Sequence, residues 1–245
     1  MRIAGSRCVI VAGRRGLGRE IAVALSTAGA DVAVSSRTAA APLTTADAAH
    51  ATVGRVVAVT GGVSTAAGAT DLICDAAAAL GGLDAVVFAA GAPFSPQPPH
   101  EVDETAFDAV FDTLVKGFYY SAVAAHDLFV AENRDGVVVG VTDVMGIRPW
   151  AAFAAHCAAK AAQSMLVRSL ALAWADDGVR VCAVAPGPLA LADDPRADAT
   201  ARAAARTPLG RAADPAEVAA AVRFCIENDY LTGNELVVDG GASLH

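Results

Sequence analysis

The sequence predicts a doubly wound α/β fold, in which a parallel sheet of about seven strands carries helices on both faces. Short runs of β-branched and other apolar residues alternate with long alanine-rich stretches along most of the chain. The short runs contain few polar residues, as is typical of parallel strands that are buried on both faces. A glycine-rich turn follows the first run, as in sheets that bind ligands at the carboxyl ends of their strands.

Each expected element follows from this alternation. The apolar runs predict strands over 8–11, 31–35, 56–59, 85–88, 137–141, 179–184 and 235–238. The alanine-rich stretches between them predict helices over 17–28, 66–80, 104–133, 153–174 and 215–228. Segments 93–99 and 189–208 interrupt the alternation with proline and charged residues. We expect 189–208 to be a substrate lid, because long loops in such folds tend to carry function; a plain surface excursion is the alternative.

Length and composition favour one globular domain. The 245 residues, of which 55% are hydrophobic, can bury one large core, and no linker-like stretch divides them. We therefore expect a single domain over 1–245. A net charge of -8 without any basic stripe argues against a nucleic-acid partner and favours a small-molecule substrate. The chain starts without a signal pattern and has no uninterrupted apolar run near about 18 residues, so we expect a cytoplasmic protein without a membrane partner.

The five cysteines are dispersed, odd in number and embedded in apolar runs. This pattern favours neither a disulfide framework nor a metal site, and no metal ion is expected. We expect all of them to be small core residues: Cys8, Cys74, Cys157, Cys182 and Cys225.

Several short motifs stand after expected strands or on expected helices, always in the same order as in one known family. They are AGRRGLG (12–18), FAAG (88–91), HCAAK (156–160), APGPL (185–189), YLTG (230–233) and VVDGG (237–241). Over nearly the whole chain these motifs resemble those of short-chain dehydrogenase/reductases. The resemblance implies a Rossmann-type fold, a nicotinamide cofactor and oxidoreductase activity. Asp143, the Asp193-Asp194-Pro195 segment and YLTG look most like the pteridine reductase branch, which usually carries a tyrosine where this chain has His156.

The glycine-rich turn is the expected cofactor-binding site. Backbone N–H groups of such a turn approach a pyrophosphate, and the following helix N-terminus adds favourable partial charge. In a gapless alignment with the family, Ala12 stands at the first glycine position, so we expect Gly13 to take over the tight turn. The resemblance extends the site to the ends of later strands. The expected cofactor-binding residues are Ala12, Gly13, Arg14, Arg15, Gly16, Leu17, Gly18, Ser36, Arg37, Ala90, Gly91, Lys160, Pro186, Gly187 and Leu189.

Charge at these turns favours NADP(H) over NAD(H). An acidic residue at the end of the second strand would bind the ribose 2'-hydroxyl of NAD, but Ser36 and Arg37 stand there. Arg15, with Arg14 beside it, adds donors suited to a phosphate monoester.

Some contacts that are usual in the family are missing. Phe88-Ala89 replaces a pair of asparagines, Gly62 replaces an aspartate, and Leu191 replaces a hydroxyl residue at the nicotinamide end. Each loss removes about 1 kcal/mol of net hydrogen bonding. We therefore expect the cofactor to bind more weakly than in a typical family member.

The expected reaction centre departs from the family's pattern at three of four positions. In the family a tyrosine transfers the proton, a lysine lowers its pKa and holds the nicotinamide ribose, a serine polarises the carbonyl and an asparagine sustains a water relay. Here these positions are His156, Lys160, Asp143 and Leu114. His156 and Lys160 are four residues apart, so they share one face of a helix. Histidine has an ordinary pKa of about 6.5 and can act as acid or base at neutral pH.

Three functions are open for this centre. The first is reduction of a C=O, C=N or activated C=C bond, with protonated His156 as the acid and Asp143 orienting the substrate. The second is non-redox chemistry, in which neutral His156 paired with Asp143 abstracts a proton in an isomerase, dehydratase or cyclase. The third is a catalytically inactive scaffold or ligand sensor. We favour the first, an NADPH-dependent reductase of a cyclic or aromatic-like ketone, imine or enone.

Apolar and aromatic residues near the centre are expected to form the substrate pocket, which suits a flat, apolar, cyclic molecule. Core packing is the alternative for Met145 and Phe153. The resemblance also implies a homodimer or homotetramer, assembled through helices 104–133 and 153–174 and the last strand. The expected substrate-binding residues are Phe94, Met145, Trp150, Phe153 and Leu189.

Overall fold

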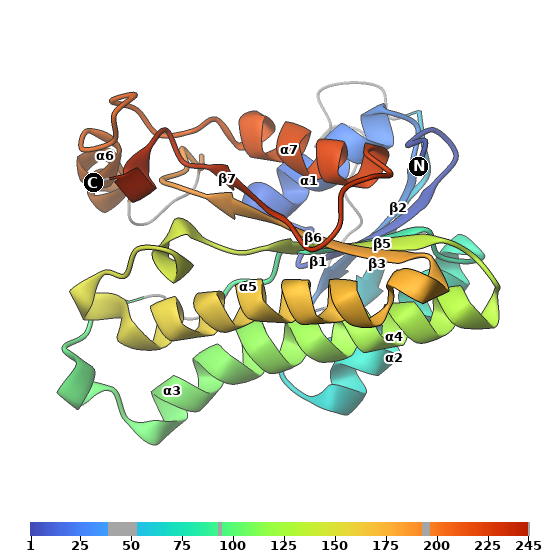
Figure 1. The fold of residues 1–245 in the computed structure, drawn as a ribbon, viewed down its shortest axis with the longest axis horizontal. Helices are drawn as coiled ribbons and strands as arrows, with labels where there is room; N and C mark the ends of the chain where they lie inside the picture. Colours follow the sequence, from blue (N-terminus) through green and yellow to red (C-terminus); the bar gives the residue numbers. More distant parts are fainter. Residues whose placement is uncertain (39–52, 93–94, 193–196, 245) are drawn as a thin grey trace.

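A computed structural model of the chain describes residues 1–38, 53–92, 95–192 and 197–244. Its centre is a seven-stranded sheet in the order β3-β2-β1-β4-β5-β6-β7, and every neighbouring pair is parallel (Figure 1). This confirms the predicted fold class. The strands are β1 (Arg7–Val11), β2 (Asp31–Ser36), β3 (Val56–Thr60), β4 (Ala85–Phe88), β5 (Gly136–Val141), β6 (Val179–Pro186) and β7 (Glu235–Val238).

Helices cover both faces of the sheet. Figure 1 shows α1 (Gly16–Thr27) and α7 (Pro215–Glu227) on one face, and α2 (Ala66–Leu80), α4 (Gly117–Ala131) and α5 (Ala154–Ala173) on the other. Successive side chains of a strand point to opposite faces, so Val9 and Val11 join the core under α2 and α4, while Cys8 and Ile10 join the core under α1 and α7. The central strands are buried on both faces, as their continuous apolarity predicts.

The two edge strands are the exception to that burial. β3 and β7 were predicted to be buried like the rest, but each of their residues is half-buried or exposed. The prediction is wrong there because an edge strand has one sheet neighbour and less helix over it.

The helix predicted over 104–133 is present from Glu104 to Ala131, and it contains one irregular turn. It consists of α3 (Glu104–Phe111), a wide π turn (Asp112–Lys116) and α4. At the start of α4 the backbone comes close to the loop after β3, where a Cβ on Gly117 would lie 2.7 Å from the Val63 carbonyl oxygen. Leu114 lies in this π turn, just before α4. Such turns are frequent near functional sites.

Four of the five cysteines are core residues, as predicted. Burial raises the pKa of the Cys8 and Cys225 thiols to about 12 and that of Cys182 to about 11, so none of these thiols is a nucleophile at neutral pH. The prediction is wrong for Cys74, which lies on the outer side of α2 and is exposed. Among the described residues, no group of three His, Cys, Asp or Glu side chains could hold a metal ion.

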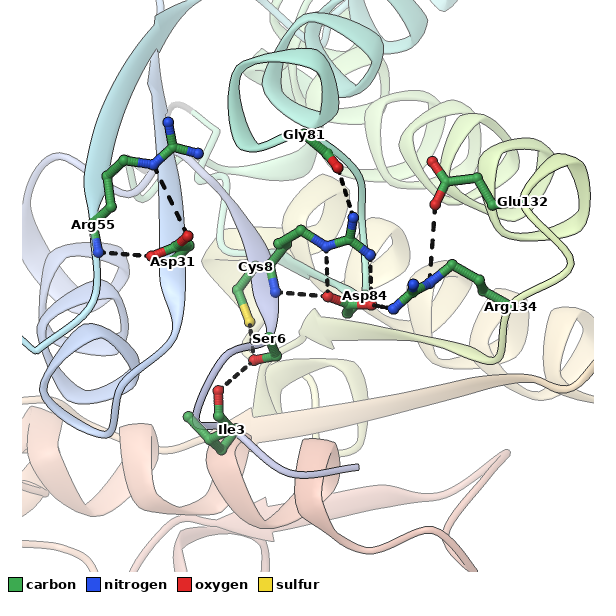
Figure 2. A network of polar contacts seen from close by, with 10 residues as sticks. Ile3, Ser6, Cys8, Asp31, Arg55, Gly81, Asp84, Glu132 and Arg134 are labelled. Carbon is green, nitrogen blue, oxygen red and sulfur yellow. Dashed lines mark hydrogen bonds and ion pairs between the residues drawn. The ribbon is translucent and has the colours of Figure 1, made fainter.

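A buried carboxylate ties three parts of the fold together at the amino end of β4 (Figure 2). Asp84, which is 5% exposed, accepts hydrogen bonds from the backbone N–H of Arg7 at 2.8 Å and from its Nε at 2.9 Å. Arg134, just before β5, donates to the other carboxylate oxygen. Burial by itself raises the pKa of Asp84, but the hydrogen bonds from Arg7 and Arg134 outweigh it and hold the pKa below its ordinary value.

We expect Asp84→Asn to lower the free energy of unfolding by about 1–3 kcal/mol at pH 7, since two guanidinium groups lose their charged partner. Because the folded-state pKa of Asp84 is lowered, its stabilisation is present above the unfolded pKa and is lost as the pH falls through the folded pKa. Urea unfolding at pH 7 and below about pH 4 checks both points. The matched control is Asp31→Asn, whose more exposed carboxylate accepts from the Arg55 backbone N–H at 2.8 Å (Figure 2). Equal losses in the two variants would contradict the expectation.

Candidate active site

Asp143 stands two residues after the end of β5, and the backbone of the turn that follows holds its side chain in place. It caps the short 3-10 turn Val144–Gly146, and its Oδ1 accepts a hydrogen bond from the Met145 backbone N–H at 2.8 Å. The second carboxylate oxygen, Oδ2, therefore has a fixed direction. It lies 3.5 Å from the Nε2 atom of His156.

His156 lies in the first turn of α5, with Lys160 one turn further on. Both side chains are buried; only 10% of the His156 side chain is exposed. The ring and the Asp143 carboxylate therefore form a pair at the edge of the core, which the sequence placed close together but could not show to be in contact.

Lys160 donates a hydrogen bond from Nζ to the Val141 carbonyl oxygen at 2.8 Å. Only 5% of the residue is exposed. Burial lowers the pKa of its ammonium group to about 8, although the carboxylates of Asp143 and Glu235 act in the opposite direction. The three predicted catalytic residues thus meet at the carboxyl end of β5.

Two features that the sequence analysis missed support this arrangement. A Cβ on Gly146 would lie 2.9 Å from the Lys160 carbonyl carbon, so only glycine lets the turn after Asp143 lie directly on α5. Glu235 of β7 accepts hydrogen bonds from Ser164 at 2.7 Å and from Thr142. In the sequence, the contacts of Glu235 were indicated only by its being an acidic residue in an otherwise apolar strand.

A cavity of about 890 Å³ opens beside this centre. Asp143 is part of its wall, whereas His156 and Lys160 are not among the described residues that line it. Four predicted pocket residues do line it, and one of them, Met145, is also buried in the core: Met145, Trp150, Phe153 and Leu189. The fifth, Phe94, lies outside the described residues.

The cavity wall also contains residues that the sequence analysis did not name. The segment before α5 contributes Arg148, and α6 (Ala197–Ala204) with the turn after it contributes Arg202 and Arg206. The expected lid segment does border the pocket, but its residues 193–196 lie outside the described part of the chain. Two of these arginines stand in the long segment 189–208, but only the fold shows that they line the same cavity as Arg148.

The glycine-rich turn joins β1 to α1 at the same edge of the sheet. Ala12 itself adopts the left-handed conformation, with a φ of 62°, so the expectation that Gly13 takes over the tight turn is wrong. Gly13 serves packing instead, because a Cβ there would lie 3.0 Å from Ile10 and from Val34. The Ala12 backbone N–H donates to Ser35 Oγ at 3.0 Å, which ties the turn to β2.

Gly16 and Gly18 give this turn the form of a phosphate cradle. Gly16 has a φ of 55°, and a Cβ on Gly18 would lie 2.4 Å from the Ala12 carbonyl oxygen. Leu17 packs against the core under α1, so its backbone alone can serve a ligand. These features fit a dinucleotide phosphate at the amino end of α1.

The remaining predicted cofactor residues lie around that cradle. Arg15 is the N-cap residue of α1, and Arg37 follows the end of β2; both are exposed. Arg14 is half-buried, and Ser36 donates from Oγ to the Thr38 carbonyl oxygen at 2.8 Å. At the ends of β4 and β6 lie Ala90, Gly91, Pro186 and Gly187, with open space beside Gly91.

The positions of the missing family contacts are also defined. Leu114 is completely buried and packs with Val110 and Ala159, so an apolar cluster stands where a water relay would begin. Leu191 lies beside the cradle, with its Cδ1 3.7 Å from where a Cβ on Gly16 would be. Space is open at Gly62, where no side chain can bind an adenine.

Comparisons with known proteins agree with this fold and show the family. A family model described as "Enoyl-(Acyl carrier protein) reductase" matches residues 11–243. The chain belongs to the short-chain dehydrogenase/reductase family and is an oxidoreductase of that type. The narrower likeness to pteridine reductases stays a prediction. Among the described residues, no helix combines the length and the apolar composition needed to cross a bilayer.

Particular relatives cover most of the chain. It is 36% identical over 246 residues to the 4-formylbenzenesulfonate dehydrogenase of Comamonas testosteroni, covering 96% of this chain and 97% of that one. It is 36% identical over 183 residues to the 3beta-hydroxysteroid dehydrogenase 1 of Eggerthella lenta, covering 71% and 69%. The crystal structure of a short-chain dehydrogenase from Burkholderia cenocepacia in complex with NADP superposes with a TM-score of 0.83 at 28% identity, over 99% of each chain.

Proposed function

We propose that this protein is an NADPH-dependent reductase that acts on a cyclic or aromatic-like ketone, imine or enone. The observation that carries the proposal is the Asp143–His156 pair, with 3.5 Å between Oδ2 and Nε2, beside buried Lys160 and at the wall of the large cavity. A titratable pair at this place supplies the acid that reduction requires after the loss of the family's tyrosine.

In the proposed reaction, His156 is the proton donor and Asp143 contacts the substrate. Asp143 is the member of the pair that lines the cavity, so it orients the reacting C=O, C=N or C=C group. His156 supplies the proton, and the Asp143 carboxylate, whose Oδ2 lies 3.5 Å from Nε2, positions the group that receives it. Lys160 holds the nicotinamide ribose through Nζ. The bound cofactor supplies the hydride.

We propose NADP(H) rather than NAD(H) because of the charges around the cradle. Arg15 and Arg37 stand at two turns that meet at one edge of the sheet, without a carboxylate at the end of β2 that would repel a 2'-phosphate. The complex of the Burkholderia cenocepacia relative with NADP supports this choice.

The substrate we propose is flat and largely apolar where it meets the inner wall. Met145, Trp150 and Phe153 form an apolar and aromatic wall, with the two aromatic rings 6.0 Å apart in an edge-to-face arrangement. The names of the two relatives, which act on an aromatic aldehyde and on a steroid, support a ring-bearing substrate.

The lid, the single domain and the assembly are further parts of the proposal. Segment 189–208 would close over the substrate, since α6 contributes residues to the cavity wall. A homodimer or homotetramer would cover the exposed apolar residues of α5, of which Leu172 is 85% exposed and Met165 55%. We also propose that the protein works in the cytoplasm.

Calorimetric titration with NADPH, NADP+ and NADH at fixed ionic strength tests the cofactor and, with it, the reductase proposal. We expect NADPH to bind at micromolar concentrations and NADH to bind much more weakly. A carbonyl panel would then show NADPH oxidation. Binding of no nucleotide would overturn the proposal and favour a non-redox acid–base enzyme or a ligand sensor.

We expect Arg37→Gln to weaken NADPH binding about tenfold or more, because a hydrogen bond between charged groups contributes about 1.5–3 kcal/mol. NADH affinity should change little, since it carries no 2'-phosphate. The same calorimetric titration measures both affinities. Arg2→Gln, an equal loss of charge at the exposed N-terminal end, is the control. A parallel fall in NADPH and NADH affinity would assign Arg37 a role other than phosphate recognition.

A further inference from the structure

Three arginines gather at the cavity beside the reaction centre. Arg148 lies between β5 and α5, and Arg202 and Arg206 come from α6 and the turn that follows it, so two separate segments bring positive charge to one space. The described lining contains a single carboxylate, Asp143. In a chain with a net charge of -8, this local excess of positive charge requires an explanation.

Arg202 and Arg206 lie on one face. The helical turn continues past Ala204, because the Ala205 N–H donates to the Ala201 carbonyl oxygen at 2.9 Å and the Arg206 N–H to the Ala203 carbonyl oxygen at 3.1 Å. Residues four apart in such a turn are neighbours on its surface. Both residues line the cavity, Arg202 from α6 and Arg206 from the turn after it.

None of the three side chains forms an ion pair or hydrogen bond with another group in the described part of the chain. Other arginines do: Arg7 is bound to Asp84, Arg211 to Glu217 and Arg223 to Glu227. The cavity arginines are also exposed to solvent. Within the described residues, no group of the protein occupies their donors, and guanidinium groups match carboxylate and sulfonate oxygens in bidentate geometry.

The glycine-rich cradle is separate from these arginines. None of its residues, 12–18, is among the described residues that line the cavity. The cavity adjoins the cradle at Leu191, which lines the cavity and lies 3.7 Å from where a Cβ on Gly16 would be. The arginines belong to other elements than the cradle, and the nucleotide affinity of their variants distinguishes a substrate anion from a cofactor phosphate.

We propose that Arg148, Arg202 and Arg206 bind an anionic group, a carboxylate or sulfonate, carried on the ring of the substrate. The apolar wall of Met145 and Trp150 takes the ring itself. This inference rests on the proposed function only in treating the cavity as the substrate site. It makes the substrate an anionic cyclic carbonyl compound rather than a neutral one.

Binding of 4-formylbenzoate and of its neutral methyl ester, without any nucleotide, tests the inference independently of turnover. Quenching of tryptophan fluorescence reports occupancy, because Trp150 lines the cavity. We expect the carboxylate to bind at least about tenfold more tightly than the ester at low salt, with a preference that falls as salt rises. The double variant Arg202→Gln/Arg206→Gln should reduce the preference to less than about threefold. Arg2→Gln should retain it.

Equal affinity of the wild-type protein for the acid and the ester would overturn the inference, and so would a preference that survives in the double variant. A fall in NADPH affinity of the same size in the double variant would assign the arginines to the cofactor and overturn it as well. If the double variant fails to fold, as far-UV circular dichroism would show, Arg148→Gln on the other wall replaces it. Retained carboxylate preference in a protein that binds no nucleotide would refute the reductase proposal alone.

Discussion

Replacing His156 with phenylalanine should lower the turnover number for carbonyl reduction by about two to four orders of magnitude, the usual contribution of a positioned general acid. Phenylalanine fills most of the space of the imidazole but leaves Asp143 Oδ2 without the Nε2 atom that stands 3.5 Å away. The affinity for NADPH should stay within about threefold, because the ring is not part of the cradle. Stopped-flow absorbance of NADPH oxidation, with calorimetry for the nucleotide, measures both quantities.

The matched control is His126→Phe. His126 lies on α4 and stacks on Trp174 at 4.5 Å, at the opposite end of α5 from His156. It should retain wild-type turnover. A His156→Tyr variant, which brings back the family's usual residue, should recover part of the lost activity, with Lys160 one turn away. Wild-type turnover in His156→Phe would refute the proton-transfer role.

Replacing Lys160 with methionine should raise the stability of the protein at pH 7 while it removes activity. The buried ammonium group has its pKa lowered from 10.5 to about 8, which corresponds to roughly 3 kcal/mol of unfavourable burial of the charged form. Methionine has a similar length and no charge. The substitution also removes the hydrogen bond to the Val141 carbonyl oxygen, which lowers the free energy of unfolding by about 1 kcal/mol. We expect a net gain of about 1–3 kcal/mol, or a few degrees in melting temperature.

The sign of the pH dependence follows from the same lowered pKa. Between about pH 8 and 10.5 the unfolded chain binds a proton at Lys160 that the folded chain does not, so wild-type stability gains from this group as the pH rises. The difference between Lys160→Met and the wild-type protein should therefore shrink from pH 7 to pH 10. Thermal unfolding at both values measures it.

Lys116→Met, at the chain's other lysine, is the control. That side chain is about half exposed and bonded to Asp112, so its replacement should give no gain at pH 7. Destabilisation by Lys160→Met at pH 7, or a difference that does not change with pH, would contradict the expected cost of burying the charge.

The fold was predictable because its signals are local. Parallel strands that are buried on both faces require continuous apolar runs, and the seven runs lie within two residues of the observed strands. The long helix from Glu104 was predicted, but the π turn within it after Phe111 was not predictable, because a π turn leaves the apolar and polar pattern almost unchanged. The exposure of Cys74 escaped prediction for a similar reason, since an alanine-rich helix marks its buried face weakly.

For the candidate active site, the sequence indicated which residues belong to it and at which edge of the sheet they lie. It did not indicate which of their side chains are in contact. The i to i+4 spacing placed His156 and Lys160 on one helix face without any structure. That the Asp143 carboxylate reaches the His156 ring depends on the close approach of Gly146 to α5, a distance between two segments that no local pattern encodes. The left-handed backbone of Ala12 likewise comes from its place in the turn between β1 and α1, because that conformation favours glycine and the residue itself does not predict it.

The sequence by itself determined the family, the parallel sheet, the cofactor turn and the unusual triplet of Asp143, His156 and Lys160, because motif order and apolar periodicity are properties of the chain alone. Only the tertiary structure decided that Asp143 lines the cavity while His156 does not, and that Arg148 joins Arg202 and Arg206 around one cavity. The first fact depends on how the turn after β5 packs on α5, and the second on how α6 packs near the segment before α5, about 50 residues away in the chain. Packing of this kind is fixed by the whole core.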